Sequence, residues 1–363
     1  MKKTLAILLA LLLVLVNVAA LAEDPTYTAT EAFSFKPIPK NYYAEEPTDE
    51  NEGTVAVVYP AETITFTAKS DTTNPDGGKA EVTVTALAVS AVSGNKIEVN
   101  VPALSLPGVY KFTINEVAGS TQGVTYTGVA TDLSISVLVS FDLDKDPTGK
   151  TLKVENYGVT ATGFIENEDG TKTPIKVDEI ANTYKVADLV VTKTVSGNLG
   201  DKNKYFPVEV TLTPSEGKTV RSDITITGET ITETDKVVGT IAAGDGWDAE
   251  HAKTVTIWVK DGSTITFKNV PENVTYTVKE TEATEHLSAA SDEPNNPDAY
   301  LVGGEVKTAA TISATGTNKV DLTNKKDVTI DTGVNMETVP YIMLLAVAMI
   351  GIAVLALRKR EEY

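Results

Sequence analysis

Residues 189–195 read LVVTKTV, and this stretch decides the fold of the chain. Successive side chains of an extended strand point to opposite faces, so the odd-numbered positions here share one face. That face carries Leu189, Val191 and Val195, whereas threonines occupy the opposite face. The pattern predicts a strand with one buried face, and it places Lys193 among the side chains that point to the core.

The same two-residue alternation, rich in threonine, valine, isoleucine and tyrosine, recurs along most of the chain. It is clearest at residues 62–68, 81–87, 109–114, 133–141 and 254–259. Turn signals containing glycine, proline, asparagine or aspartate separate such segments, as at residues 75–78, 93–95, 146–149 and 260–262. Between residues 32 and 328 we find no amphipathic helical pattern of useful length. Many short strands with regular turns predict an all-β fold of Ig-like β-sandwiches.

A domain boundary is predicted near residues 184–187, where one strand series closes and the LVVTKTV strand opens another. We therefore expect a first β-sandwich domain at residues 23–186 and a second at residues 187–328. The linker between them is very short, so the two domains should stack end to end as an elongated rod with little hinge freedom.

Both ends of the chain carry targeting signals. Residues 1–22 combine a basic start, an apolar segment and a small-residue cleavage site, which together indicate a secretory signal peptide. Residues 329–363 combine the polar motif TIDTG, an uncharged apolar segment at 339–357 and a basic tail. The apolar segment is long enough to cross a bilayer as a helix, with the basic tail in the cytoplasm. It is either a plain membrane anchor or part of a sortase sorting signal that is cut between Thr332 and Gly333.

Composition excludes several kinds of function. The chain has 50 acidic and 31 basic residues and a net charge of −19, which argues against nucleic acid as a ligand. It has no cysteine, so thiol catalysis and thiolate metal sites are excluded. The loop that starts at Asp142 looks like the beginning of a calcium loop, but Pro147 stands where that loop needs glycine. His251 and His286 have no evident catalytic or metal-binding partner, and we predict no metal and no cofactor.

Three polar residues occupy core-facing positions in three strands of the second domain. Lys193 is one, Glu280 follows Val274, Tyr276 and Val278 in alternation, and Asn324 follows valine and leucine at 320 and 322. A buried unpaired charge would cost several kcal/mol, so these groups need one another or a reaction.

The reaction available to them is an intramolecular isopeptide bond. Burial lowers the pKa of a lysine, so its amine can be neutral, and raises the pKa of a carboxylic acid, so the acid can stay protonated. The neutral amine can then attack the side-chain amide carbon of an asparagine. The acid relays protons, ammonia leaves, and fixed proximity replaces an enzyme. Two other interpretations remain open from the alternation alone. Lys193 could extend from the strand end to water, and Glu280 and Asn324 could be a solvated strand end and a turn.

The second domain resembles the C-terminal domain of streptococcal backbone pilins, the pilin isopeptide-linkage family related to CnaB-type domains. The matching segments are 189–197 (LVVTKTVSG), 260–262 (KDG), 269–280 (NVPENVTYTVKE) and 322–327 (LTNKKD). This resemblance implies a Lys193–Asn324 crosslink promoted by Glu280.

The first domain resembles the N-terminal domain of the same pilins. The resemblance matches Lys36 in FSFK to the lysine strand, Glu116 to the acid strand and Asn182 in IAN to the asparagine strand. It implies a Lys36–Asn182 crosslink promoted by Glu116. The alternation supports Glu116 independently, because that residue continues the apolar face of Tyr110, Phe112 and Ile114.

The tail is similar to the same pilins in its Thr-Gly-Val triplet and in the Pro-Tyr pair that opens the apolar segment. The resemblance implies that a sortase forms a thioester on Thr332 and passes it to a lysine of the next subunit. Lys172, in the context KTPI, matches the family's acceptor position, and Lys176 is a close competitor.

Two departures from the family matter. Ile330-Asp331 stands where sorting motifs usually carry proline, which favours a dedicated sortase. The other common pilin motif contains Tyr-Pro-Lys. Here Tyr59-Pro60 is followed by Ala61, so the lysine of that motif is absent.

The sequence as a whole predicts a structural backbone subunit of a Gram-positive pilus, secreted and anchored to the cell wall after transient membrane retention. Its expected partners are a sortase, identical subunits, minor pilins and peptidoglycan. The alternative is a wall-anchored adhesin that does not polymerise. A secreted hydrolase is disfavoured because no nucleophile–base set is visible. The predicted catalysis is single-turnover and acts only on the chain itself, through Glu116 and Glu280, so we do not expect an enzyme.

Overall fold

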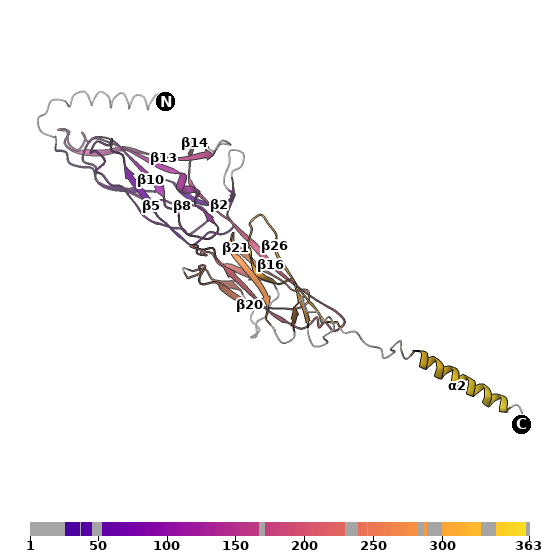
Figure 1. Ribbon diagram of the computed structural model, residues 1–363. Coiled ribbons are helices and arrows are strands. Elements are labelled where there is room, and N and C mark those ends of the chain that lie inside the picture. The colour runs from indigo at the N-terminus through magenta and orange to yellow at the C-terminus, as the bar shows by residue number, and fades with distance from the viewer. Residues whose placement is uncertain are drawn as a thin grey trace.

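The described part of the chain forms two β-sandwich units in line, followed at a distance by a C-terminal helix (Figure 1). The computed structural model describes residues 26–36, 38–45, 53–166, 171–228, 239–244, 246–281, 286–288, 300–327 and 339–360. The predicted all-β fold of Ig-like sandwiches in an elongated molecule is confirmed. The predicted signal peptide and the sorting residues Thr332 and Gly333 lie outside the described residues.

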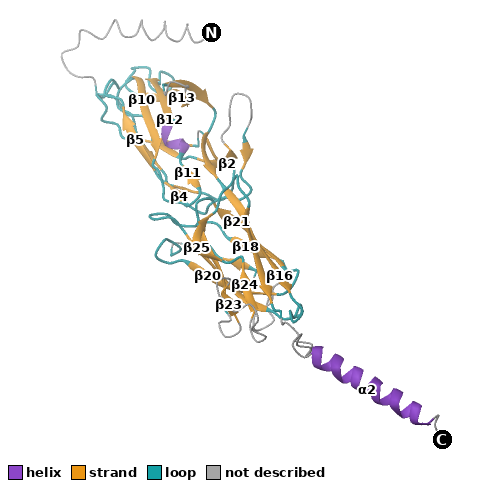
Figure 2. Ribbon diagram, turned by 45° about the vertical axis from the view of Figure 1, so that its right-hand side comes forward, coloured by secondary structure: helices purple, strands orange, loops and turns teal. Residues whose placement is uncertain are grey.

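Short strands dominate the first unit, and Figure 2 shows how loops and turns separate them. Their bounds are β1 Phe33–Phe35, β2 Pro39–Glu45, β3 Thr54–Val55, β4 Thr63–Ile64, β5 Phe66–Ser70, β6 Thr83–Val84, β7 Leu87–Ala88, β8 Asn95–Lys96, β9 Val99–Val101, β10 Gly108–Glu116, β11 Val124–Thr125, β12 Asp132–Phe141, β13 Leu152–Glu166, β14 Lys172–Val177 and β15 Ile180–Tyr184. One short 3-10 turn, η1 Thr127–Ala130, lies between β11 and β12.

Two five-stranded sheets organise the first unit, in the orders β14-β13-β12-β10-β5 and β11-β15-β2-β3, with β8 paired to β2. A three-stranded sheet, β1-β9-β6, and the pair β4-β7 complete it. Strand β10 shows why the sequence folds this way, since Tyr110, Phe112 and Ile114 alternate with polar residues and are all buried. These side chains join the main hydrophobic core of the unit.

Two of the predicted strands prove to be broken. Residues 62–68 contain β4, which pairs with β7, and the start of β5, which pairs with β10. Residues 81–87 likewise hold β6, which pairs with β9, and the start of β7. Both segments pass from one sheet to another, a change of direction that alternation along the sequence cannot reveal.

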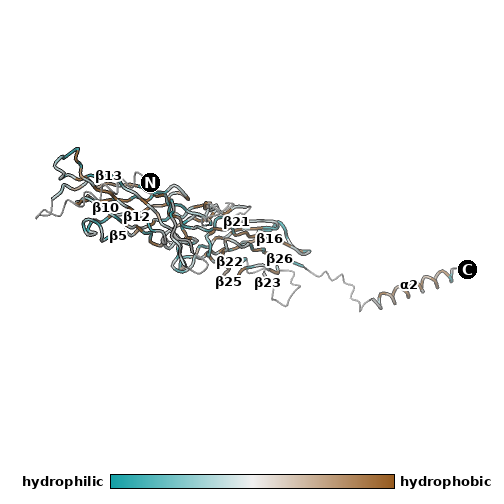
Figure 3. The backbone as a smooth tube through the Cα atoms, turned by 90° about the horizontal axis from the view of Figure 1, so that it is seen from above, coloured by the Kyte–Doolittle hydropathy of each residue, from teal (hydrophilic) through white to brown (hydrophobic). Residues whose placement is uncertain are grey.

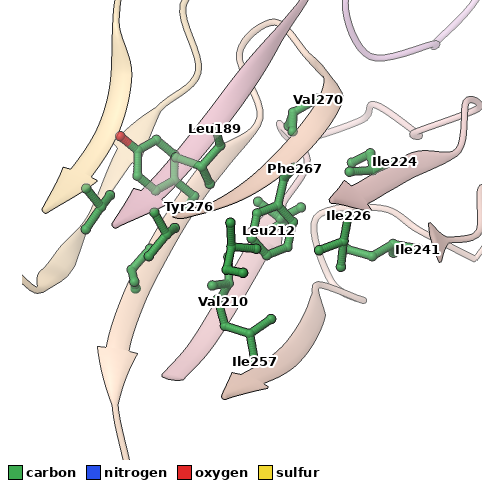
Figure 4. Packing of buried hydrophobic residues seen from close by; sticks show 14 of the residues in the cluster. Leu189, Val210, Leu212, Ile224, Ile226, Ile241, Ile257, Phe267, Val270 and Tyr276 are labelled. Atoms are coloured by element: carbon green, nitrogen blue, oxygen red, sulfur yellow. The ribbon is translucent and has the colours of Figure 1, made fainter. Parts of the chain in front are cut away.

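The second unit is a sandwich of a seven-stranded and a four-stranded sheet. Their orders are β19-β18-β21-β16-β26-β24-β23 and β20-β17-β22-β25. The bounds are β16 Val186–Ser196, β17 Phe206–Thr213, β18 Ile224–Thr227, β19 Thr240–Ile241, β20 Lys253–Val259, β21 Thr264–Pro271, β22 Thr275–Glu280, β23 His286–Ser288, β24 Tyr300–Gly303, β25 Val306–Thr311 and β26 Asn318–Lys325. Figure 4 shows the core between the sheets, where Leu189 and Phe267 of one meet Leu212 and Tyr276 of the other.

Each unit pairs an early strand with its last strand in parallel. In the first unit β2 pairs with β15, and in the second β16 pairs with β26. Most of the other strand pairs are antiparallel. The parallel pairs matter because each one brings residues far apart in sequence to the same sheet position.

The two units join where β15 ends at Tyr184 and β16 begins at Val186. The Gln122 side chain crosses the junction: its Nε2 donates to the Glu272 carbonyl at 2.7 Å, and its Oε1 accepts from the Ser215 amide at 2.8 Å. Backbone hydrogen bonds from Gln122 N to Thr219 O and from Ala61 N to Arg221 O add to it. These contacts hold the units end to end.

Helix α2, Val339–Arg360, stands apart from both sandwiches. Its segment Tyr341–Lys359 is long and apolar enough to cross a membrane, and none of it is buried against the rest of the chain. The brown colour of this helix in Figure 3 contrasts with the mixed colouring of the strands. The helix therefore fits the predicted membrane-spanning segment.

Candidate functional site

In the second unit, the three core-facing polar residues meet. Lys193 Nζ lies 2.5 Å from Glu280 Oε2, and both side chains are fully buried. Asn324 Nδ2 donates to the other carboxylate oxygen, Oε1, at 2.6 Å. One carboxylate thus holds an amine on one oxygen and an amide nitrogen on the other.

Alternation along three strands produces this arrangement. Lys193 alternates with Leu189, Val191 and Val195 on β16, and along β26 every second residue up to Asn324 is buried. The structure confirms the predicted faces and contradicts the interpretation of Lys193 and Asn324 as solvent-directed. The backbone amide of Glu280 donates to Glu305 Oε1 at 2.9 Å, which helps to hold the end of β22 in place.

The first unit contains a matching constellation, but its lysine is Lys40. Lys40 Nζ lies 2.7 Å from Glu116 Oε2, with both side chains fully buried. Asn182 Nδ2 donates to Glu116 Oε1, also at 2.7 Å. The predicted Glu116 and Asn182 therefore meet at this site, as the shared face of β10 indicated.

The prediction of Lys36 as the crosslinking lysine is wrong. Its side chain is 61% exposed and lies 3.5 Å from Glu98 on the surface. The reason is that Lys36 follows the end of β1, which pairs with β9, whereas Asn182 is on β15, which pairs with β2. Lys40 lies on β2 itself, directly across from Ile180.

A sequence signal for Lys40 was available. Ile38, Lys40 and Tyr42 alternate on one face and are all buried. This is the same pattern that identified Lys193, with a lysine between apolar residues at a spacing of two. The resemblance to the pilin motif predicts Lys36 instead, because that motif matches FSFK.

The two constellations share one register. Lys40 lies opposite Ile180 and Lys193 lies opposite Leu322, and in each unit the asparagine is two residues beyond that partner. Two residues along a strand return to the same face, so lysine and asparagine point into the core side by side. A third strand supplies the carboxylate: Glu116 is on β10 in the first unit, and Glu280 is on β22 in the second.

Burial controls the charge of both amines. Loss of hydration lowers the pKa of Lys40 and of Lys193 below the usual lysine value, although the neighbouring glutamate opposes the shift in each case. A lowered pKa increases the fraction of neutral amine, which is the nucleophilic form. The Lys193 amine also lies 4.5 Å from the centre of the Phe206 ring, so apolar surface encloses it.

The two asparagine carbonyls differ in their surroundings. Asn182 Oδ1 accepts a hydrogen bond of 2.9 Å from the backbone amide of Gly128, on the 3-10 turn η1. Asn324 Oδ1 is buried, and among the residues that the structure describes it has no hydrogen-bond partner. Sequence reasoning missed Gly128, because a backbone amide carries no residue-type signal.

The predicted acceptor lysines lie on β14, at one edge of its five-stranded sheet. In the register of β14 against β13, Lys172 lies opposite Glu166. The Lys172 side chain lies outside what the structure describes. Lys176, which pairs with Thr162, is exposed. The strand therefore presents at least Lys176 to solvent, and the choice between the two lysines stays a prediction.

Comparison with known proteins gives matches over most of the chain. A family described as a domain of unknown function (DUF7601) matches residues 187–326. The chain is 28% identical over 252 residues to a protein named pilin from Streptococcus pyogenes serotype M1. That match covers 68% of this chain and 66% of the pilin, just under two thirds of its length.

Solved structures with similarity to this chain include major pilins of the same organism. The T3.2 major pilin of Streptococcus pyogenes is 17% identical with a TM-score of 0.42, covering 84% of this chain and all of the other. Another S. pyogenes major pilin is 19% identical with a TM-score of 0.41, over 83% of this chain and all of the other. The resemblance to streptococcal pilins that the motifs indicated is confirmed by the sequence match.

Proposed function

We propose that this chain is the structural backbone subunit of a covalently polymerised pilus, with an intramolecular Lys–Asn isopeptide bond in each sandwich. The observation that carries the proposal is the pair of buried Lys–Glu–Asn constellations in the same parallel register. The sequence match to a streptococcal pilin supports the same function. The proposed location is the cell surface, with helix α2 holding the precursor in the membrane.

The contacts support a simple route to each bond. The neutral lysine nitrogen attacks Cγ of the asparagine, and a new Nζ–Cγ bond forms. The carboxyl group takes a proton from the amine on one oxygen and delivers a proton to Nδ2 on the other, so the Cγ–Nδ2 bond breaks and ammonia leaves. Atoms and charge balance without a cofactor, and fixed proximity lowers the barrier.

Polymerisation would join the C-terminal tail of one subunit to the first unit of the next. A sortase would form an acyl intermediate on Thr332, release Gly333 with the helix, and pass the acyl group to a lysine of the next subunit. The edge strand β14 supports this, since it carries the exposed Lys176 and lies in the first unit, far from helix α2. The protein would act as a sortase substrate and not as an enzyme.

The internal bonds are tested by the intact mass of the secreted chain without its tail. Two bonds lower the mass by two ammonia molecules relative to the sequence, and peptide mapping should find Lys40 joined to Asn182 and Lys193 joined to Asn324. An unmodified mass for the folded protein would refute the crosslinking proposal in both units.

Polymerisation is tested on denaturing gels of cell-wall extracts. A backbone subunit gives a ladder of high molecular weight, whereas a wall-anchored adhesin that does not polymerise gives one band. Strains with Lys172→Arg and Lys176→Arg identify the acceptor, because arginine keeps the charge and cannot be acylated in its place. A ladder that survives the double variant would exclude both lysines.

A further inference from the structure

We infer that the backbone amide of Gly128 is a catalytic group for the first-unit crosslink, acting as a hydrogen-bond donor to the oxyanion that forms on Asn182. The inference rests on the crosslinking chemistry proposed above and adds a group that stabilises its intermediate. The starting observation is the hydrogen bond of 2.9 Å from Gly128 N to Asn182 Oδ1. When the lysine attacks Cγ, negative charge develops on this oxygen, and a donor already in place stabilises it.

The position of the donor is fixed by the surrounding structure. Turn η1 is tied to strand β15 because Thr127 Oγ1 donates to the Ala181 carbonyl at 2.9 Å, one residue before Asn182. The turn is closed by a hydrogen bond from the Thr131 amide to the Gly128 carbonyl. The amide of Gly128 is therefore held in place before the reaction starts, which is the condition for effective electrostatic catalysis.

Only glycine fits at this position. A Cβ on residue 128 would overlap Glu116 Oε2 and lie 2.6 Å from Ile180 Cγ2 and 3.0 Å from Asn182 Oδ1. The chain thus brings a bare backbone amide against the reacting atoms, where a side chain would displace the carboxylate. Residue 128 is a glycine because its backbone passes too close to the reacting groups to leave room for a side chain.

The second unit provides a natural contrast. Asn324 Oδ1 is just as buried as its counterpart, yet it receives no hydrogen bond from any residue that the structure describes. The lysine and glutamate contacts are otherwise equivalent in the two units. The second crosslink therefore forms without this donor. Its rate is the reference within the same molecule against which the rate of the first crosslink is compared.

The direct test replaces one backbone N–H group by an oxygen and keeps every side chain. Glycolic acid replaces Gly128 in a cell-free translation of the full chain, in detergent that accommodates helix α2, so that an ester replaces the amide. Samples are quenched over time, and peptide mapping measures the linked fractions Lys40–Asn182 and Lys193–Asn324. The matched control places the same ester at Gly217, an exposed turn position in the second unit.

The expected result is that the ester at 128 slows the first crosslink about 100-fold relative to the second, in line with loss of one oxyanion donor. The control ester should leave the ratio of the two rates at its wild-type value. An unchanged ratio in the Gly128 ester would overturn the inference while leaving the crosslinks themselves intact. Failure of both links in the wild-type chain would instead refute the proposed chemistry, and this inference with it.

A second measurement does not depend on the ester variant. In the unreactive Lys40→Met chain, hydrogen exchange at the Gly128 amide should be slow, and adding Asn182→Ala should make it faster by at least about tenfold. Equal exchange rates in the two chains would show that the amide does not donate to Asn182.

Discussion

Lys40 and Lys36 are four residues apart and have opposite environments. Lys40 is fully buried against Glu116, whereas Lys36 forms a surface ion pair with Glu98. Lys40 shares the carboxylate of Glu116 with the amide of Asn182, whereas the Lys36 amine lies on the surface away from that amide. The position of a lysine in the sheet, and not its nearness to a motif, therefore decides whether it can crosslink.

This difference predicts the outcome of two matched substitutions. Lys40→Met keeps the length of the buried side chain but removes the nucleophile, so the mass deficit should fall from two ammonia molecules to one. Lys36→Met should keep both, since it alters only a surface pair that contributes little to stability. Intact mass spectrometry of the two purified variants decides between them, and loss of a bond in Lys36→Met alone would restore the original assignment.

The lowered pKa of Lys40 also predicts how stability depends on pH when the bond cannot form. In an Asn182→Ala variant the amine stays free, and burial keeps its folded-state pKa below the unfolded value of 10.5. Between these two values the unfolded chain binds more protons than the folded chain. The free energy of unfolding should therefore rise with pH through this window and fall as the pH drops towards the folded-state pKa.

The measurement is denaturant unfolding of this variant at neutral pH and at a pH just below 10.5. The Asn182→Ala/Lys40→Met double variant is the control, because it lacks the buried amine and keeps every other titrating group. The increase in the free energy of unfolding from neutral pH to the higher pH should be larger in the single variant than in the double variant. Equal gains would mean that Lys40 has an ordinary pKa in the folded protein.

Strand β26 shows how alternation sets the chemistry of the second unit. Its buried and exposed residues alternate along the whole strand, and Asn324 is buried while Thr323 is exposed. A shift of one residue in a strand moves every side chain to the other face. Whether this asparagine reacts is therefore a property of the strand register as much as of the residue type.

Exchanging two neighbours tests this point. In the double variant Thr323→Asn/Asn324→Thr the amide moves to the exposed face, so the Lys193 bond should be lost and the mass deficit should fall by one ammonia. Thr323→Asn alone adds the same surface asparagine and leaves Asn324 in place, so both bonds should persist. A bond from Lys193 to residue 323 in the exchanged variant would show that the strand can slip.

The elongated shape depends on the contacts that hold one sandwich against the other. Gln122 is buried at the junction and bonds to the backbone of two second-unit residues. Both constellations lie within their own units, so neither proposed crosslink would fix the angle between the units. The relative position of the two units thus rests on hydrogen bonds at the junction, such as those of Gln122.

Gln122→Ala should therefore loosen the junction without affecting either crosslink. It leaves the Glu272 carbonyl and the Ser215 amide, both in half-buried residues, without this partner. Each loss costs at most about 1–3 kcal/mol, so the two units should sample a wider range of angles. Small-angle X-ray scattering of the secreted chain should show a broader distribution of interatomic distances. Ser120→Ala is the control, because Ser120 contributes its backbone carbonyl to the junction and that group is retained. Identical scattering of all three proteins would contradict this role.

The sequence by itself determined the all-β fold, the apolar C-terminal helix and five of the six predicted site residues, which lie buried in two groups. It could do so because alternation along a single strand records which side chains enter the core, as it does for Lys193, Glu116 and Asn324. Only the tertiary structure decided that Lys40 replaces Lys36 and that the Gly128 amide reaches Asn182. The choice of lysine depends on which strand pairs with β15, and the amide depends on where a turn packs, and both are contacts between segments far apart in the chain.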